Sequence, residues 1–365
     1  MTRIWPFRVS ILIVAVVVCI YGSRQRLLAT DDALVTVASS HFQVIDLGTL
    51  PTDNWSEANS INDKGQVLCT AGIRKDYDPN VANSRAFLWE QGRQRDLGTL
   101  AHSPDTQGIA INNRSQILGK ALLSSSSFSP FRVFLWQDGS LRDLPTLSLP
   151  GIEPMALSDA SEIVGGVARG ATISQQKAFV WKNGKFQSLG LPLGSVANDI
   201  NHSDAAHPFL LTGEVQGTGF LWRNGQLLKM RMAGTWGVHL HAVNASGQSV
   251  GGVDLTTGHS HALLWQKGKI TDLGTLAARH DSMATAINRE SVVVGWATTS
   301  PDSLMHAVLW RGKAIQDLNN EIRTIPRLIL SSAKGINNHG QIICDGFLAD
   351  AGNNEHQHAY LLIPR

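Results

Sequence analysis

The chain has 365 residues, of which 43% are hydrophobic and only 16% are charged. This balance supplies a large apolar core and excludes an intrinsically disordered protein. The 31 Lys and Arg residues against 29 Asp and Glu give a net charge of +2, but Arg3, Arg8, Arg24 and Arg26 all lie in the first 30 residues, which leaves 27 basic against 29 acidic residues. No basic run or stripe follows, so the composition also excludes nucleic-acid binding.

The N-terminus has the features of a targeting segment. Residues 1–8 are basic and Val9–Tyr21 form a continuous apolar run, shorter than the roughly 17–25 residues of a membrane-spanning helix and typical of a signal peptide. No clear cleavage site follows, so a cleaved signal and a retained signal anchor both stay open. We therefore divide the chain into a signal peptide or signal anchor (1–23), a linker (24–40) and a folded domain (41–365).

Residues 41–365 contain one unit that recurs seven times. An apolar-apolar-Trp triplet marks it, and the copies begin at Phe87, Phe134, Phe179, Phe220, Leu263 and Val308, with a degraded copy at Tyr360. Trp89 and Trp310 are 221 residues apart over five intervals, a period of ~44 that lies in the range of propeller blades.

Two further markers keep the same period. An aliphatic residue followed by Asn recurs before a turn, at Asn62, Asn112, Asn201, Asn244, Asn288 and Asn337. The phrase Asp-Leu-Gly-Thr-Leu stands at 46–50, 96–100 and 272–276. In the first unit these markers delimit four short segments, 57–62, 66–71, 85–90 and 94–100. Four antiparallel strands per ~44 residues predict one propeller blade, in which the repeated Asn and Asp make local turn hydrogen bonds.

The two ends of the domain complement each other. The last unit supplies three strands, near 333–337, 341–345 and 358–363, and then the chain stops. A spare strand at 42–50 carries the fourth-strand phrase. Pairing it with the C-terminal strands closes the ring and removes an open sheet edge, which predicts an all-β, seven-bladed β-propeller of four-stranded antiparallel blades.

The repeats resemble the HAF-repeat family of bacterial extracellular proteins. The resemblance rests on Asp-Leu-Gly-Thr-Leu, on the Ile-Asn-x-x-Gly-Gln phrase at 61–66 and 336–341, and on x-Ala followed by the apolar-Trp pattern. No His-Ala-Phe copy is intact: three copies keep the His (His261, His306 and His358), and two keep the Phe (Phe87 and Phe179). The resemblance implies a secreted or surface protein and implies no reaction.

The repeated Trp residues are expected to pack against the next blade, because a buried aromatic removes about 150–250 Å² from water. Trp55, Trp236 and Trp296 break the repeat and are better candidates for ligand recognition. We place Trp55 and Trp236 in connections between blades, and Trp296 at the end of a second strand.

Histidines raise the question of a metal site. His261, His306 and His358 occupy equivalent places in successive units, which repeat drift explains without zinc. His239 and His241 share one face of an inner strand but lack a third ligand. Residues 76–80 begin like a calcium loop, but the positions of the required Gly and Glu hold other residues. We expect no metal and no cofactor.

Cys69 and Cys344 replace a repeated Gly in blades that ring closure makes neighbours. A disulfide needs Cα atoms within about 7 Å, and second strands of adjacent blades are expected to be farther apart. Two small buried thiols are therefore the favoured interpretation, with a disulfide as the alternative.

No catalytic motif is present, and no catalytic residue is assigned. Connections between blades can nevertheless gather polar side chains at one mouth of the channel, and the candidates there are Asp53, His102, Asp105, Glu153, His280 and Asp281. The ligand-binding candidates are Trp55, His102, Asp105, Trp236, His239, His280 and Asp281.

The leading hypothesis is an exported, non-catalytic propeller that binds or scaffolds a protein or glycan at the cell envelope, with its function on loops. We expect a monomer that contacts the membrane only through an uncleaved N-terminal segment. The alternatives are an exported carbohydrate-active hydrolase or lyase with acid residues at the channel mouth, and a purely structural envelope module.

Overall fold

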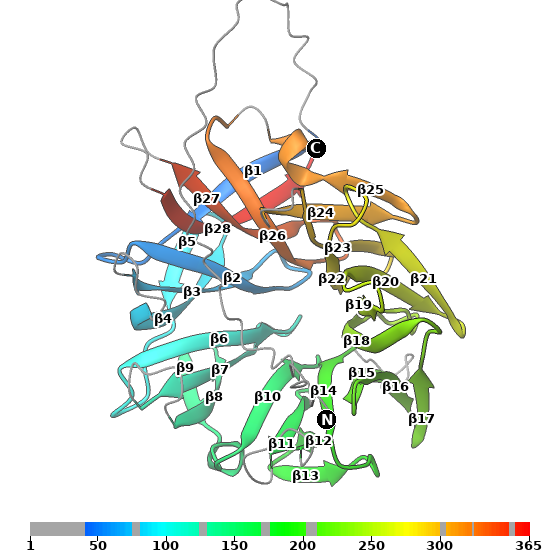
Figure 1. The fold of residues 1–365 in the computed structure, drawn as a ribbon. Helices are drawn as coiled ribbons and strands as arrows, with labels where there is room; N and C mark the ends of the chain where they lie inside the picture. The colour runs from blue at the N-terminus through cyan, green and yellow to red at the C-terminus, as the bar shows by residue number, and fades with distance from the viewer. Residues whose placement is uncertain are drawn as a thin grey trace, which may run out of the picture.

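A computed structural model describes residues 41–74, 81–123, 130–168, 176–201, 210–299, 304–322, 325–349 and 355–365. These residues form seven four-stranded antiparallel sheets, arranged as blades around a common centre (Figure 1). The seven-bladed β-propeller expected from the repeats is confirmed.

Blades 1–6 each run from an inner strand to an outer strand in chain order, and blade 7 takes its outer strand from the start of the domain. The strands are β2 (Trp55–Ile61), β3 (Val67–Arg74), β4 (Val81–Glu90) and β5 (Arg93–Asp96) in blade 1; β6 (Asp105–Ile111), β7 (Ile117–Leu122), β8 (Phe131–Gln137) and β9 (Ser140–Asp143) in blade 2; β10 (Ile152–Leu157), β11 (Ile163–Ala168), β12 (Gln176–Lys182) and β13 (Lys185–Ser188) in blade 3; β14 (Ser195–Ile200), β15 (Leu210–Val215), β16 (Thr218–Arg223) and β17 (Gln226–Met230) in blade 4; β18 (Thr235–Val243), β19 (Ser249–Leu255), β20 (Ser260–Gln266) and β21 (Lys269–Gly274) in blade 5; β22 (Ser282–Ile287), β23 (Val292–Thr298), β24 (Met305–Arg311) and β25 (Ala314–Asp317) in blade 6; and β26 (Leu328–Ile336), β27 (Ile342–Ala349), β28 (Glu355–Pro364) and β1 (Phe42–Gly48) in blade 7. Two short 3-10 helices, η1 (Pro145–Leu147) and η3 (Leu318–Glu321), follow β9 and β25.

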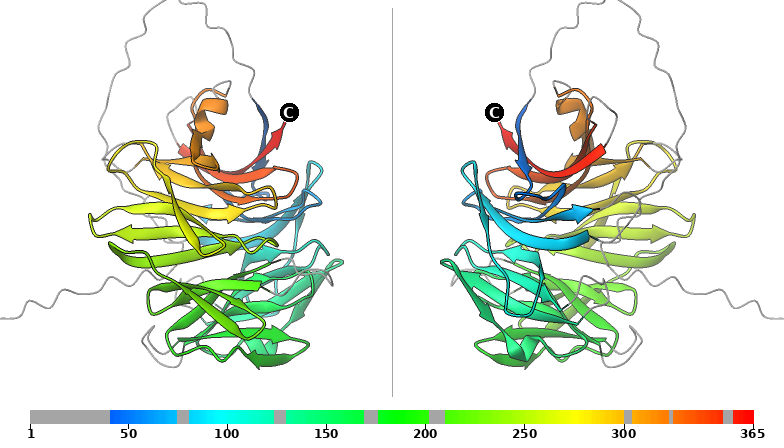
Figure 2. Two further views of the ribbon diagram at one scale, coloured as in Figure 1. Left: turned by 90° about the vertical axis from the view of Figure 1, so that its right-hand side faces the viewer. Right: turned by 90° about the vertical axis from the view of Figure 1, so that its left-hand side faces the viewer.

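The ring closes as expected from the chain ends. Blade 7 has the order β1-β28-β27-β26, and β1 pairs antiparallel with β28 from Phe42–Pro364 to Gly48–Ala359. Figure 2 shows the N-terminal strand (blue) beside the C-terminal strand (red). Pairing the two ends satisfies the edge of β28, which would otherwise present unpaired N–H and C=O groups.

The outer strands are shorter than the sequence phrases suggest. In blade 1 the outer strand ends at Asp96, so Leu97–Leu100 leave the sheet. The Asp96 side chain accepts a hydrogen bond from the backbone N–H of Gly98 at 2.8 Å, and Asp46 does the same for Gly48. The repeated Asp therefore makes the local turn bond that was expected of it.

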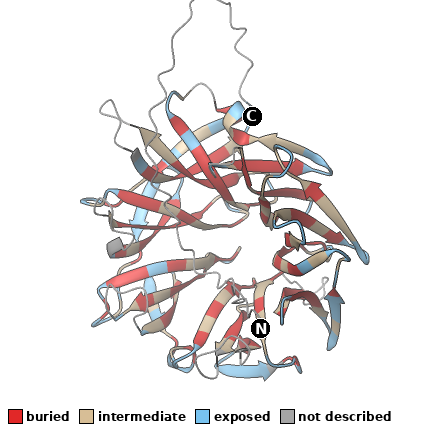
Figure 3. Cartoon of the chain, viewed as in Figure 1, coloured by how far each residue is buried: buried red, intermediate tan, exposed pale blue. Residues whose placement is uncertain are grey.

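The apolar core is divided into seven clusters, and each lies between two neighbouring blades. One cluster joins Phe87 and Trp89 of blade 1 to Ile343 and Leu361 of blade 7, and another joins Trp136 of blade 2 to Leu88 and Leu97 of blade 1. The repeated Trp is thus a core residue, but it packs against the preceding blade rather than the next one. Figure 3 shows exposed positions on the outer hairpins.

The propeller has two different faces. Among the described residues, the turns between the first two strands of a blade, such as 62–66 and 337–341, lie on one face, which we call the turn face. Both described chain ends lie there as well, because His41 O accepts a hydrogen bond from Arg365 N at 3.0 Å and Pro364 lies 3.3 Å from where a Cβ on Gly340 would stand. The opposite face, the connection face, carries the links between blades, the ends of the second strands and the starts of the third strands.

The repeated Asn residues join neighbouring blades around the turn face. Asn62 Nδ2 donates to Asn112 O at 2.9 Å, while its own Oδ1 accepts from the backbone of Lys64 and Gln66. The same bond to the next blade is made by Asn112, Asn244, Asn288 and Asn337. The structural role expected for Asn is confirmed, and it extends beyond the local turn.

Every inner strand contains a β-bulge at its centre. The bulged residues are Asn59, Ile109, Met155, Asn198, His241, Thr285 and Lys334. Three of them bond the next inner strand: Asn198 Nδ2 donates to Leu240 O, Thr285 Oγ1 donates to Ala333 O, and His241 Nδ1 lies 3.0 Å from Ala284 O. A bulge bends a strand and increases its twist, so the repeated bulge shapes the channel wall.

Cys69 and Cys344 are both fully buried free thiols, so the disulfide alternative is wrong. They occupy the second-strand position that Gly295 holds in blade 6, where a Cβ would stand 2.0 Å from Met283 O. Burial raises the pKa of both thiols well above the ordinary value, which makes them poor nucleophiles.

Two expectations from the sequence lie outside the described residues: the N-terminal segment with its linker (1–40), and the Asp-rich stretch 76–80. Within the described ranges, no helix has the length and apolar character needed to span a membrane.

Candidate binding face

Large apolar side chains are exposed mainly on the connection face. Seven of the nine exposed large apolar residues of the described chain lie at the ends of strands or in links on this face: Leu123, Leu149, Leu193, Trp236, Leu304, Met305 and Ile329. The other two, Phe186 and Leu228, lie on the outer strands β13 and β17. A face with an apolar side chain on most of its blades is a candidate interaction surface.

Trp236 is the most exposed of these residues, with 72% of its surface accessible. It lies within β18 rather than in a connection as expected, and it is the extra residue of a bulge, because Thr235 pairs with Leu255 and Gly237 pairs with Asp254. A bulge can re-aim a side chain at the edge of a sheet. The sequence identified this Trp only because it departs from the repeat.

His239 lies two residues farther along β18 and is held by two carboxylates. Its Nδ1 is 3.0 Å from Glu214 Oε1 of blade 4, and its Nε2 is 2.9 Å from Asp254 Oδ2 of blade 5. The hydrogen bond with Asp254, and next that with Glu214, raise the pKa of His239 to about 10. An imidazole with a raised pKa and both nitrogens engaged by carboxylates is unsuited to act as a general base near neutral pH.

Asp281 and His280 lie at the start of β22, beside this triad. Asp281 Oδ1 accepts a hydrogen bond from Ser260 N at 2.9 Å and lies 3.3 Å from His259 Nδ1. Ser260 Oγ in turn donates to Asp254 Oδ1 at 2.7 Å. His280 Nδ1 is 3.4 Å from Thr298 Oγ1.

Four of the seven binding candidates therefore lie on the neighbouring blades 5 and 6: Trp236, His239, His280 and Asp281. The other three lie on blades 1 and 2. Trp55 is only 5% exposed and starts β2, and Asp105 is fully buried at the start of β6, so the expectation that Trp55 lies in a connection is wrong. His102 is exposed in the link before β6, with a left-handed φ of 62°.

A polar cluster missed at the sequence level lies where blade 7 meets blade 1. Asp345 of β27 accepts a hydrogen bond from Ala58 N at 2.9 Å and lies 3.2 Å from Lys334 Nζ. Burial raises the pKa of Glu57, although attraction to Lys334 opposes the shift. The only hydrogen bond shown for this carboxyl among the described residues is a long one, 3.4 Å, from Asn59 Nδ2.

The signal for this cluster was weak, because Glu57 and Lys334 come from opposite ends of the chain and neither belongs to a repeated phrase. The channel-mouth candidates Asp53 and Glu153 do not belong to this cluster. Glu153 forms an ion pair with Lys120 of blade 2, and burial is the main cause that raises the pKa of Asp53.

His261, His306 and His358 share one contact that the sequence did not indicate. Each lies at the start of a third strand with its Nδ1 2.7–3.0 Å from the repeated Asp of the outer strand: Asp272, Asp317 and Asp46. In blades 1 and 2 the same place holds Arg85 and Arg132, which pair with Asp96 and Asp143. Five of the seven blades therefore place a cation or imidazole opposite this Asp. No group of metal-binding residues occurs among the residues described.

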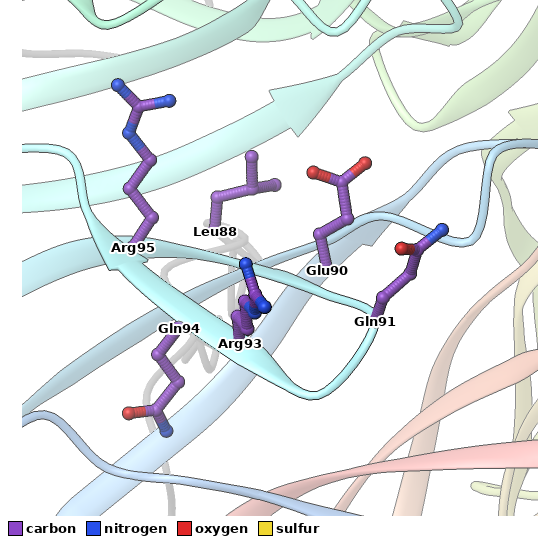
Figure 4. A pocket seen from close by; sticks show the side chains of 6 residues that line it. All are labelled: Leu88, Glu90, Gln91, Arg93, Gln94 and Arg95. Carbon is purple, nitrogen blue, oxygen red and sulfur yellow. The ribbon is translucent and has the colours of Figure 1, made fainter.

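Two surface pockets lie away from these candidates. The larger, of about 520 Å³, is bordered by the β4–β5 hairpin (Leu88, Glu90, Gln91, Arg93, Gln94 and Arg95) and is shown in Figure 4. The second, of about 340 Å³, lies between β17 and the outer hairpin of blade 5. Arg95 stacks over the Trp136 ring at 5.1 Å and Gln94 donates to Leu47 O, so these side chains already serve contacts between blades.

Comparison with known proteins supports the architecture and nothing finer. No protein-family model and no curated protein sequence matches the chain, so the likeness to HAF repeats gains no support. A streptogramin B lyase structure aligns with a TM-score of 0.55 and 14% identity, over 90% of this chain and 100% of that one. Virginiamycin B lyase from Staphylococcus aureus aligns with a TM-score of 0.53 and 12% identity, over 89% of this chain and 100% of that one.

The β-propeller domain of the Trilobed protease from Pyrococcus furiosus gives a TM-score of 0.50 and 10% identity, over 84% of this chain and 95% of that one. That domain is described as having an open velcro topology, whereas β1 closes the ring here. At such low identities, the similarity places this chain among β-propeller proteins by fold alone.

Proposed function

We propose that the protein is an exported, non-catalytic β-propeller that binds a protein or glycan partner through its connection face. The observation that carries this proposal is Trp236, a 72% exposed indole at a bulge on a face with further exposed apolar side chains. Indoles at binding surfaces bury a large area on association. The neighbouring His239 is locked between two carboxylates, which favours binding over proton transfer.

The placement of the chain ends supports a tethered arrangement. The folded domain begins at the turn face, opposite Trp236. If residues 1–23 stay in the membrane as an anchor, the linker 24–40 joins the turn face and spans at most roughly 60 Å when fully extended. The connection face is then free to meet a partner on the far side. The resemblance to HAF repeats also favours export, and N-terminal sequencing of the mature protein distinguishes a cleaved signal from an anchor.

A binding assay tests the proposal. Trp236→Ala is expected to weaken capture of a surface protein or of a glycan on an array at least tenfold, because alanine removes the central indole. Leu228→Ala is the matched control, since Leu228 is 48% exposed on the outer strand β17, away from the connection face. Equal binding by both variants would contradict the proposal. So would a protein that binds no partner and hydrolyses a polysaccharide.

The alternative of a purely structural module predicts a flat, polar face. The seven exposed apolar side chains on the connection face argue against it. Thermal stability that is unchanged in Trp236→Ala, combined with lost binding, would separate a recognition role from a structural role for the indole.

One observation favours a second candidate function, a carbohydrate-active hydrolase or lyase. Burial raises the pKa of Glu57, while Asp345 nearby is bonded to Lys334 and to Ala58 N. Two carboxyl groups in contrasting environments can divide acid and base roles. Turnover of a polysaccharide panel that disappears in Glu57→Gln would support this function, whereas full activity in that variant would exclude Glu57 as its acid.

A further inference from the structure

The chain links near Trp236 are short, and hydrogen bonds hold their backbone in place. The links from the second to the third strand are only Gln216–Gly217 in blade 4 and 256–259 in blade 5, shorter than the corresponding links of the other blades. Val238 N donates to Gly217 O, and Thr256 N donates to Gly234 O. The backbone on both sides of the indole is therefore fixed, and the short links leave its ring open to a partner.

Two carboxylates lie near the backbone that carries this indole. Asp254 is the cross-strand partner of Gly237, the residue after Trp236, and its side chain is 36% exposed. Asp281 is 43% exposed and is connected to Asp254 through Ser260. Gly237 allows the approach of the triad, since a Cβ there would stand 3.0 Å from His239 Nε2.

The charges at this place sum to a negative value. Glu214, Asp254 and Asp281 carry three negative charges, and His239 supplies one positive charge between the first two. Arg279 is exposed in the link that precedes Asp281, which still leaves a negative excess. Arg231 does not belong to this group, because it borders the pocket between β17 and the outer hairpin of blade 5.

We infer that Trp236, Asp254 and Asp281 form a subsite for a Lys or Arg side chain of a protein partner. An ammonium or guanidinium group is attracted to the face of an indole and to adjacent carboxylates, and both lie exposed here. A protein is favoured over a glycan because, of the seven exposed apolar side chains on this face, only Trp236 is aromatic. Aliphatic side chains such as Leu149 and Leu193 suit apolar protein residues. This inference rests on the proposed binding function.

The test uses the full-length protein and three peptides, observed by NMR titration. The probe is acetyl-Leu-Lys-Leu-Lys-Leu-amide, and the matched peptides replace lysine with norleucine or glutamate. The lysine peptide is expected to bind about tenfold more tightly than the norleucine peptide, and its affinity should fall as the salt concentration rises. Trp236→Ala and Asp281→Asn should each remove most of this preference, and Trp236→Phe should retain part of it.

The outcomes separate the inference from the function on which it rests. If all three peptides bind equally well and Trp236→Ala weakens them all, the cation subsite is wrong while the binding face stands. If glucosamine oligomers bind in a Trp236-dependent way and the lysine peptide does not, the partner is a glycan and the inference is overturned. If no probe depends on Trp236, both proposals fall.

Discussion

Asn337 of the last blade donates its side-chain N–H to the carbonyl oxygen of Asn62, 275 residues away in the chain, at 3.0 Å. Asn62 makes the same bond to Asn112 in the next blade. One residue type therefore completes its own turn and joins its blade to the neighbour. Ring closure depends on this bond as well as on the pairing of β1 with β28.

Asn337→Ala is expected to lower the free energy of unfolding by about 1–3 kcal/mol, because it removes the acceptor of the backbone N–H groups of His339 and Gln341. It also removes the hydrogen bond to Asn62 O, which among the described residues then accepts only from Gly65 N. Urea unfolding measures the change. Gln226→Ala, at an exposed place on β17, should stay within about 0.5 kcal/mol of the parent. Similar values for the two variants would show that the bond between blades contributes little.

Leu47→Ala tests the closing strand. Leu47 is 1% exposed and belongs to the cluster between blades 7 and 1, so its truncation should cost about 2–5 kcal/mol. Gln43, on the same strand and exposed, provides the control Gln43→Ala, which should be nearly neutral. If thermal unfolding of Leu47→Ala matches that of the control, β1 is not an integral part of the domain.

The His239 triad predicts a dependence of stability on pH. The folded pKa, about 10, lies above the unfolded value of about 6.5, so the stabilisation is complete below about pH 6.5 and is lost as pH rises toward 10. The stability difference between the parent and His239→Gln should shrink by up to about 1.4 kcal/mol per pH unit in that window.

His241→Gln is the control for this pH experiment. Burial lowers the pKa of His241, so its neutral form persists above pH 6.5 and its contribution should stay flat there. Denaturant unfolding at pH 6, 8 and 10 provides the comparison. A constant difference for His239→Gln across the three pH values would mean that its imidazole is not held in the charged form.

A substitution at Gly295 tests how tightly the second strand of blade 6 packs against the bulged inner strand. In Gly295→Ala the new Cβ would stand 2.0 Å from Met283 O, so the strands must separate, at a cost of about 1–3 kcal/mol. Cys69→Ala at the equivalent place in blade 1 removes only a sulfur atom and should cost less. Unfolding midpoints measured in urea decide the order, and the reverse order would contradict the proposed clash.

Much of the architecture could be predicted from the sequence. Strand repeats of ~44 residues and the spare strand at 42–50 predicted the blades and the closed ring, because hydrophobic period and a missing strand are properties of the chain itself. The repeated Trp residues were predicted to be core. Only the direction of their packing was wrong, because the side of the sheet to which a third strand turns its side chains depends on the twist of the blade.

Less of the candidate face could be predicted. His261 was taken for a drifted residue because its partner Asp272 belongs to another strand, and only the register of β20 with β21 places the two side chains side by side. Trp55 and Trp236 look equivalent as departures from the repeat, yet one is buried and the other is exposed. A one-residue bulge at Trp236 accounts for that difference, and no residue pattern marks it.

The sequence by itself determined the strands, their number and the partners of the first and last strands, since these follow from local alternation and from the count of repeated segments. The tertiary structure decided which side chains share a site. Glu57 meets Lys334 and Asp345, and His239 meets Glu214, only because closing the ring sets inner strands of neighbouring blades at a fixed distance. Burial and mutual charge at those contacts then set the protonation behaviour of Glu57 and His239.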